Sequence, residues 1–204
     1  PEADAEVVLM AAAALTELGV PNLSVDLGLP TLVPAICEAL DIDLSADELE
    51  LKTALNLKDE PAIVRLGEKL GSRASELFSG LLNSVGPADN ALKTLHKIDL
   101  PEKAKAELEN LSAVINCLHE RSPDLAITID PVETRGYEYH SGVTFTFFAL
   151  DVRGEIGRGG RYLADNANGN SGGSGSDETA TGVSLFIDSI LRALPEPSPQ
   201  DRVF

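Results

Sequence analysis

The periodicity of apolar residues changes along this chain, and that change restricts the fold more than any other feature. Between residues 44 and 121 apolar positions recur at helical spacing, whereas 125–129 (L-A-I-T-I) and 143–150 (V-T-F-T-F-F-A-L) read as buried strands. The longest helix is predicted to start near Pro101, with an apolar stripe formed by Ala104, Leu108, Leu111, Ile115 and Leu118. Helices and strands in separate blocks indicate an α+β fold.

The first 43 residues are predicted to form a helix (4–18), a strand (23–27) and a second helix (31–40). Gly19 ends the first helix, and Pro34 is tolerated because it lies in the first turn of the second. Apolar residues at helical spacing predict which face of the first helix is buried, namely Val7, Met10, Ala14, Leu15 and Leu18.

The helical block begins with a predicted capping box formed by Ser45 and Glu48, and Gly71, Gly86 and Pro87 divide it into short helices. We therefore predict four parts of the chain. They are the start of a sheet-containing core (1–43), an all-α insertion (44–122), the remainder of the core (123–194) and a proline-rich tail (195–204).

A hairpin is predicted from the strand at 143–150, a turn at 151–154 and a return strand starting at 155–158. Residues 166–177 are rich in Gly, Ser and Asn, which predicts a flexible loop, and its position indicates that it orders over the site described below. The last element, 182–194, reads as an apolar strand running into a helix.

Charge restricts the partners. The formal net charge is −17, from 33 acidic and 16 basic residues, and a field of that sign repels phosphate backbones. Nucleic acid is therefore not expected as a partner. We expect Cys37 and Cys117 to be free thiols, and we find no membrane span or signal peptide, which predicts a cytoplasmic protein. The chain begins at Pro1 in what reads as the middle of a fold, so we expect a fragment.

Two clusters of Gly, Arg and Tyr stand at the ends of the predicted hairpin. One is R-G-Y-E-Y-H-S-G (135–142) and the other G-R-G-G-R-Y (157–162). A hairpin brings its two ends together, so these clusters should form one concave site for a small anionic ligand with a polar ring. On the residues alone an alternative stays open: Gly159 and Gly160 form a strand bulge, the tyrosines pack, and the arginines pair with acids.

These clusters resemble a known family. R-G-Y-E-Y-H-S-G-V-T-F is similar to the histidine-binding signature R-G-x-D-Y-Y-x-G-x-x-F of histidyl-tRNA synthetases, and G-R-G-G-R-Y to their G-G-R-Y-D. A-D-A-E-V near the start resembles the helix after the second class II motif, and the stretch from Thr181 resembles the third. The resemblance implies a class II aminoacyl-tRNA synthetase-like fold, a mostly antiparallel sheet flanked by helices with an all-α insertion.

The departures point away from a synthetase. Where the third motif carries Gly-Leu-Glu-Arg, whose Arg contacts ATP, this chain has Phe186, Ile187, Asp188 and Ser189. Loss of that cation should be costly for adenylation. The chain thus resembles the regulatory subunit of ATP phosphoribosyltransferase, a synthetase-like paralogue of histidine biosynthesis. That resemblance implies a non-catalytic protein that binds L-histidine, self-associates, and transmits feedback inhibition to a separate catalytic subunit in a hetero-oligomer.

The resemblance also implies the ligand-binding residues, which are Arg135, Glu138, Tyr139, His140, Gly159, Gly160 and Tyr162. Arg161 could instead be a structural ion-pair partner. No catalytic residue, cofactor or metal is implied, and His96 and His119 read as ordinary helical histidines without metal-ligand spacing. Two alternatives remain open: a divergent histidyl-tRNA synthetase fragment, and a structural half-domain that binds a partner but no ligand.

Overall fold

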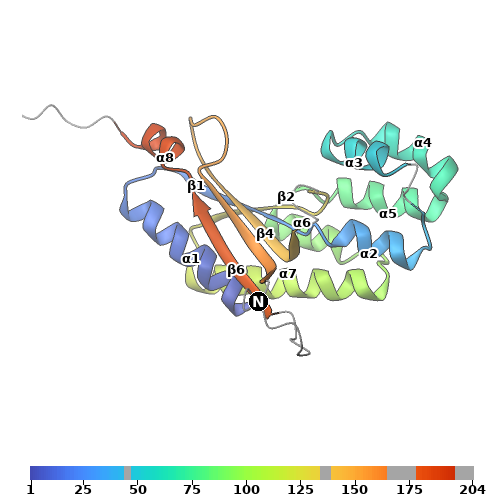
Figure 1. Cartoon of the computed structure of the whole chain (residues 1–204), viewed down its shortest axis with the longest axis horizontal. Coiled ribbons are helices and arrows are strands. Elements are labelled where there is room, and N and C mark those ends of the chain that lie inside the picture. Colours follow the sequence, from blue (N-terminus) through green and yellow to red (C-terminus); the bar gives the residue numbers. More distant parts are fainter. Residues whose placement is uncertain (44–46, 134–138, 165–177, 196–204) are drawn as a thin grey trace, which may run out of the picture.

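The computed structural model describes residues 1–43, 47–133, 139–164 and 178–195, and within them one six-stranded sheet has the order β2-β3-β1-β4-β5-β6 (Figure 1). The strands are β1 (Leu23–Gly28), β2 (Gly86–Pro87), β3 (Ala126–Asp130), β4 (His140–Ala149), β5 (Gly157–Ala164) and β6 (Glu178–Leu185). Only the β1–β3 pair is parallel, and the other four pairs are antiparallel. The predicted α+β class with a mostly antiparallel sheet is confirmed.

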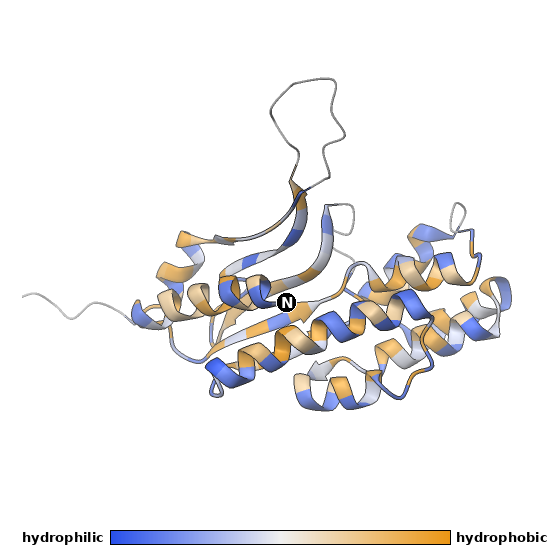
Figure 2. Cartoon of the chain, turned by 90° about the horizontal axis from the view of Figure 1, so that it is seen from below, coloured by the Kyte–Doolittle hydropathy of each residue, from blue (hydrophilic) through white to orange (hydrophobic). Residues whose placement is uncertain are grey.

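The described residues also form eight helices. Their bounds are α1 (Glu2–Glu17), α2 (Leu32–Ala39), α3 (Glu48–Asn56), α4 (Glu60–Leu70), α5 (Ser72–Leu82), α6 (Ala88–Leu95), α7 (Glu102–Arg121) and α8 (Ile187–Ala193). Helices α1 and α7 pack together, α1 contacts β6 and α7 contacts β4 (Figure 2). None of the described helices is both long and apolar enough to cross a bilayer.

Strand β4 shows why the sheet has two unlike faces. Val143, Phe145 and Phe147 are buried, whereas Thr144 and Thr146 alternate with them and point to the opposite face. The apolar side therefore meets the helices, and the polar side stays open. This alternation is the feature that positions the candidate site.

The longest helix was predicted correctly. Helix α7 begins at Glu102, directly after Pro101, and all five residues of its expected stripe are buried. Helix α2 runs over Leu32–Ala39 and keeps Pro34 in its first turn. Ser45 lies outside the described residues, so the capping box is untested, and β2 is a short edge strand that the sequence did not predict. The four-part division of the chain stays a prediction.

The buried face of α1 was predicted only in part, because Leu15 is buried as expected but other members of the expected face are not. Met10 is 59% exposed and Leu18 is 56% exposed. The buried positions are mostly alanines with two larger apolar residues, together with one acid: Asp4, Ala5, Val8, Ala11, Ala12 and Leu15. Small side chains let the helix approach the sheet and α7 closely, and the buried acid has a partner on β5, so these residues determine how the helix is rotated.

The hairpin is confirmed with shifted ends. Strand β4 starts at His140, three residues earlier than expected, and β5 starts at Gly157. Asp151 (φ 65°) and Gly154 (φ 93°) adopt left-handed backbone conformations in the turn. Strand β6 followed by α8 matches the predicted last element, while the predicted loop at 166–177 lies outside the described residues. Both cysteines are free thiols, and burial raises the pKa of Cys37 to about 11.

Candidate functional site

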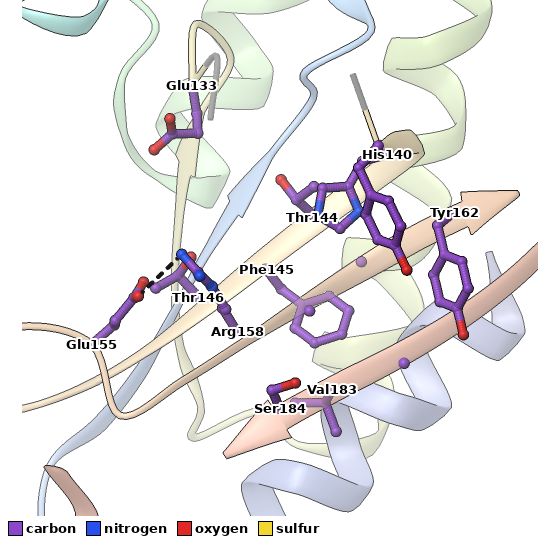
Figure 3. Close-up of a pocket in the computed structure, with 14 residues that line it drawn as sticks. Glu133, His140, Thr144, Phe145, Thr146, Glu155, Arg158, Tyr162, Val183 and Ser184 are labelled. Atoms are coloured by element: carbon purple, nitrogen blue, oxygen red, sulfur yellow. Dashed lines mark ion pairs between the residues drawn. The ribbon is translucent and has the colours of Figure 1, made fainter. Parts of the chain in front are cut away.

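A pocket of about 570 Å³ lies on the open face of the sheet (Figure 3). Its walls come from β4, β5 and β6 and from Glu133, which follows β3. His140 and Tyr162 stand at one end, and Glu155 and Arg158 at the other (Figure 3). Tyr139 stacks on Tyr162 at the first of these ends. The volume falls in the range of about 300–1,000 Å³ that is usual for small-molecule sites.

The structure brings together most of the residues that the sequence singled out. Tyr139, His140, Gly159, Gly160 and Tyr162 all line the pocket. Arg135 and Glu138 lie outside the described residues, so their place in the site stays a prediction.

The aromatic end is built by the pairing of β4 with β5. His140 is opposite Tyr162, and the register shifts between His140 and Thr144, so β4 bulges there. Bulges re-aim side chains, and here the ring of His140 lines the pocket. The rings of Tyr139 and Tyr162 stack at 5.2 Å with 16° between their planes, while Tyr139 meets His140 edge-on at 5.1 Å. Such a wall suits a flat ring.

Two glycines allow the strands and the His140 ring to lie this close. A Cβ on Gly159 would lie 2.1 Å from the Gly182 carbonyl oxygen and 2.6 Å from a ring carbon of Phe145. A Cβ on Gly160 would lie 3.0 Å from His140 Nδ1. The glycines are therefore required by packing under the pocket floor, whatever ligand it takes.

The charged end was missed by the sequence reasoning. Arg158 Nη1 lies 3.3 Å from Glu155 Oε1, and the Arg158 guanidinium lies 5.7 Å from the centre of the Phe186 ring. Arg158, Gly160 and Tyr162 alternate along β5, so period-two reading would have placed Arg158 on the same face as Tyr162. The same reading finds Thr144 and Thr146 on β4.

Acidic residues border the pocket on the β1 side. Asp26 is paired in register with Thr128 and with Thr146, one of the pocket-lining residues, and the Thr128 hydroxyl donates to its carboxylate. Burial raises the pKa of Asp26. Asp130 accepts two hydrogen bonds from Lys58 Nζ, at 2.8 and 2.6 Å. This edge of the site is therefore acidic but partly neutralised.

Arg161 does not line the pocket. Its guanidinium crosses to the helix side, where Nη2 lies 2.8 Å and Nε 3.2 Å from Asp4 Oδ2. Asp4 is fully buried in α1. Arg161 is therefore the structural ion-pair partner that the sequence left open as its alternative role.

Residues 186–189, which stand where the third synthetase motif carries its Arg, place no cation on the pocket wall. Ser189 is buried in α8 and lies 3.0 Å from Arg192 Nη2. The Arg192 Nε donates to the Asp188 carbonyl, so this guanidinium folds onto its own helix. Phe186, which precedes α8, instead packs under Arg158.

No cluster with metal-binding composition occurs in the described ranges. His96 lies 3.3 Å from the Ser112 hydroxyl, and His119 lies 3.9 Å from Asp89 on the helical side of the molecule. Each histidine thus contacts a polar side chain on a neighbouring helix, as expected of an ordinary helical histidine.

The family model described as histidyl-tRNA synthetase matches residues 1–190. Two curated relatives carry the name ATP phosphoribosyltransferase regulatory subunit. The one from Paramagnetospirillum magneticum is 45% identical over 99% of this chain and 49% of its own length. The one from Rhodospirillum centenum is 43% identical over the same shares. The chain therefore spans about half the length of these relatives.

The fold is shared with solved structures. A protein from Bacillus halodurans, described as an ATP phosphoribosyltransferase regulatory subunit/histidyl-tRNA synthetase, aligns with a TM-score of 0.75 at 21% identity, covering 95% of this chain and 50% of that one. The ATP phosphoribosyl transferase (HisG:HisZ) complex from Thermotoga maritima contains a chain that aligns with a TM-score of 0.68 at 19% identity, covering 91% and 61%. At these identities the likeness concerns the fold, which is the class II synthetase-like fold.

Proposed function

Because this chain belongs to the histidyl-tRNA synthetase family, we propose that it acts as a non-catalytic regulatory subunit of ATP phosphoribosyltransferase. In this role it binds L-histidine in the pocket on the open face of the sheet. Binding then changes the activity of a separate catalytic subunit and gives feedback control of histidine biosynthesis. The names of its 43–45% identical relatives support this role.

The charge of the pocket is the observation that carries the proposal. Among the lining residues that the structure describes, Arg158 is the one cation and already faces Glu155, while Glu133 adds a second carboxylate. A wall that presents both signs of charge can pair with both charged groups of a zwitterionic amino acid. The pocket therefore suits an amino acid.

The position of α8 supports a protein that does not adenylate. Transfer of an adenylyl group requires cations where charge develops on the phosphates. Ser189 offers none, and Arg192 is bonded to its own helix. The Phe186 ring instead packs against the guanidinium of Arg158, which lines the pocket.

For the ligand we propose a site with two components. Tyr139, His140 and Tyr162 face the imidazole ring, and Gly159 and Gly160 form the floor. Arg135 and Glu138, which belong to the same signature, complete the site by contacting the carboxylate and orienting neighbouring groups. No cofactor takes part.

The partner is proposed to be the catalytic subunit, together with further copies of this protein. The fold is shared with a chain of the Thermotoga maritima complex, which supports a hetero-oligomer. Control is allosteric in this account, because histidine must bind one state of the assembly more tightly than the other. A cytoplasmic location stays a prediction.

The two alternatives make different predictions. A divergent synthetase would catalyse histidine-dependent exchange of pyrophosphate into ATP. A structural half-domain would bind its partner but no amino acid, and Arg135→Ala would then change nothing.

The test is a calorimetric titration of L-histidine into the full-length protein, with histidinol and a second amino acid as controls. Selective heat from L-histidine, with no pyrophosphate exchange, is the expected result. Exchange activity would identify a synthetase, and no binding of any amino acid would leave the structural half-domain.

A further inference from the structure

His140 has one ring nitrogen whose role the backbone determines. Its Nδ1 lies 3.2 Å from the carbonyl oxygen of Arg161. A carbonyl oxygen only accepts hydrogen bonds, so Nδ1 must carry the proton and donate. In a neutral imidazole the second nitrogen, Nε2, is then a hydrogen-bond acceptor.

This arrangement is held rigidly. Arg161 lies in β5 between β4 and β6, where it pairs with Thr181, and its side chain is tied to Asp4 at 2.8 Å. The absence of a side chain on Gly160 lets the ring approach the strand, because a Cβ there would be 3.0 Å from Nδ1. The carbonyl that orients the imidazole therefore has little freedom to move.

No described residue forms a hydrogen bond with Nε2, while the ring itself lines the pocket beside Tyr162 (Figure 3) and contacts the ring of Tyr139. An acceptor on the wall of a small-molecule site selects ligands that bring a donor, because a ligand without one leaves the buried group unsatisfied.

We propose that His140 Nε2 determines ligand specificity by accepting a hydrogen bond from the ring N–H of a bound imidazole. This inference rests on the proposed function and adds the direction of one hydrogen bond: His140 Nε2 accepts it, and the ring N–H of the ligand donates it. The adjacent stack of Tyr139 on Tyr162 offers an aromatic surface on which a flat ring can pack.

The groups around the ring favour the neutral form that this role requires. Burial lowers the pKa of His140; the hydrogen bond to the Arg161 carbonyl acts in the opposite direction, the positive charge of Arg158 adds to the lowering, and the net shift is downward. Glu133 lines the same pocket from the segment after β3, and the remaining titratable neighbours are Tyr139 and Tyr162. Near neutral pH the acceptor is therefore available.

Ligand analogues test the direction of the bond without any mutation. The panel for calorimetry with the full-length protein is L-histidine, the two ring N-methyl-L-histidines, and 2-thiazolylalanine, whose ring has a nitrogen acceptor but no N–H. The thiazole should bind about tenfold or more weakly than L-histidine, the usual effect of leaving a buried polar group unpaired. Of the two methylated forms, only the one whose methyl group replaces the donated N–H should bind as weakly as the thiazole.

Two variants separate the ring nitrogens. His140→Asn keeps an amide N–H close to the position of Nδ1, so the bond to the Arg161 carbonyl persists, but it has nothing at the position of Nε2. His140→Gln can place its amide oxygen close to Nε2. The Asn variant should lose about tenfold in L-histidine affinity and all preference over the thiazole, whereas the Gln variant should retain part of that preference.

The outcomes separate this inference from the function on which it rests. L-histidine and thiazolylalanine binding equally well to the wild-type protein would overturn the inference and leave the histidine site intact. An Asn variant that folds and keeps both affinity and preference would do the same. If the wild-type protein binds no member of the panel, the proposed function and the inference fail together. The analogue panel decides the question even if the Asn variant does not fold.

Discussion

Arg161 on β5 donates two hydrogen bonds to one carboxylate oxygen of Asp4 on α1, with Nη2 at 2.8 Å and Nε at 3.2 Å. Asp4 is fully buried and the Arg161 side chain is 22% exposed. Removal of one partner from such a pair leaves an uncompensated charge in the interior. We expect Arg161→Gln to lower the free energy of unfolding by about 3–5 kcal/mol, measured by urea denaturation.

The matched control is Arg192→Gln. Arg192 is exposed and bonds only groups of its own helix among the described residues, so its replacement should change stability by less than about 0.5 kcal/mol. Equal effects of the two substitutions would show that the Asp4–Arg161 pair does not hold α1 on the sheet.

Gly159 and Gly182 provide a second matched pair. A Cβ at Gly159 would meet the Gly182 backbone oxygen at 2.1 Å, so β6 must move away in Gly159→Ala, at a cost of about 1–3 kcal/mol. A Cβ at Gly182 would meet only the Tyr162 ring, at an ordinary 3.7 Å. Thermal denaturation should therefore show a clear loss for Gly159→Ala and almost none for Gly182→Ala. The reverse order would contradict the strand packing.

Acidification should weaken histidine binding through His140. Burial lowers the pKa of His140 below its usual value of 6.5, so the acceptor on Nε2 is present at neutral pH and is lost as the pH falls through that lowered pKa. The unfolded chain takes up this proton more readily than the folded one, so the free energy of unfolding also falls below pH 6.5. Titrations between neutral and acidic pH measure the first effect.

The control for this pH dependence is His140→Asn, which has no titrating ring. Its residual affinity should vary less with pH than that of the wild-type protein. Affinity that rises on acidification in the wild-type protein would contradict the role of a neutral His140.

Asp26 should show the opposite pH dependence. Burial raises its pKa, so the stability that this group contributes is fully present below its unfolded pKa and is lost as the pH rises through the folded one. Asp26→Asn keeps an acceptor for the Thr128 hydroxyl and removes the charge, and should therefore be more stable than the wild-type protein at neutral pH. Urea denaturation at pH values on both sides of the transition should show that advantage disappear in acid.

The elements that were predicted well are those in which local pattern and tertiary packing agree. In α7 the apolar stripe from Ala104 to Leu118 identifies one buried face. In β4 the alternation of Val143, Phe145 and Phe147 does the same. The meeting of the two Gly, Arg and Tyr clusters followed from the hairpin, because a short turn brings its two ends together, and the structure pairs His140 with Tyr162.

The elements that were predicted wrongly or missed depend on contacts with residues that are distant in the sequence. The rotation of α1 depends on a pair whose members, Asp4 and Arg161, are 157 residues apart, and no local pattern reveals it. Strand β2 consists of Gly86 and Pro87, which carry no strand pattern and are defined only by β3 beside them. The charged end of the pocket was missed for a different reason, because Arg158 was read as part of a motif and not as part of a strand face.

The central claim is tested most directly by the activity of the catalytic subunit of ATP phosphoribosyltransferase. This activity would be measured alone, with the full-length protein, and with the full-length protein plus L-histidine. We predict that the protein raises the activity and that L-histidine lowers it again, with His140→Asn requiring about tenfold more L-histidine. An activity that neither the protein nor L-histidine changes would contradict the account.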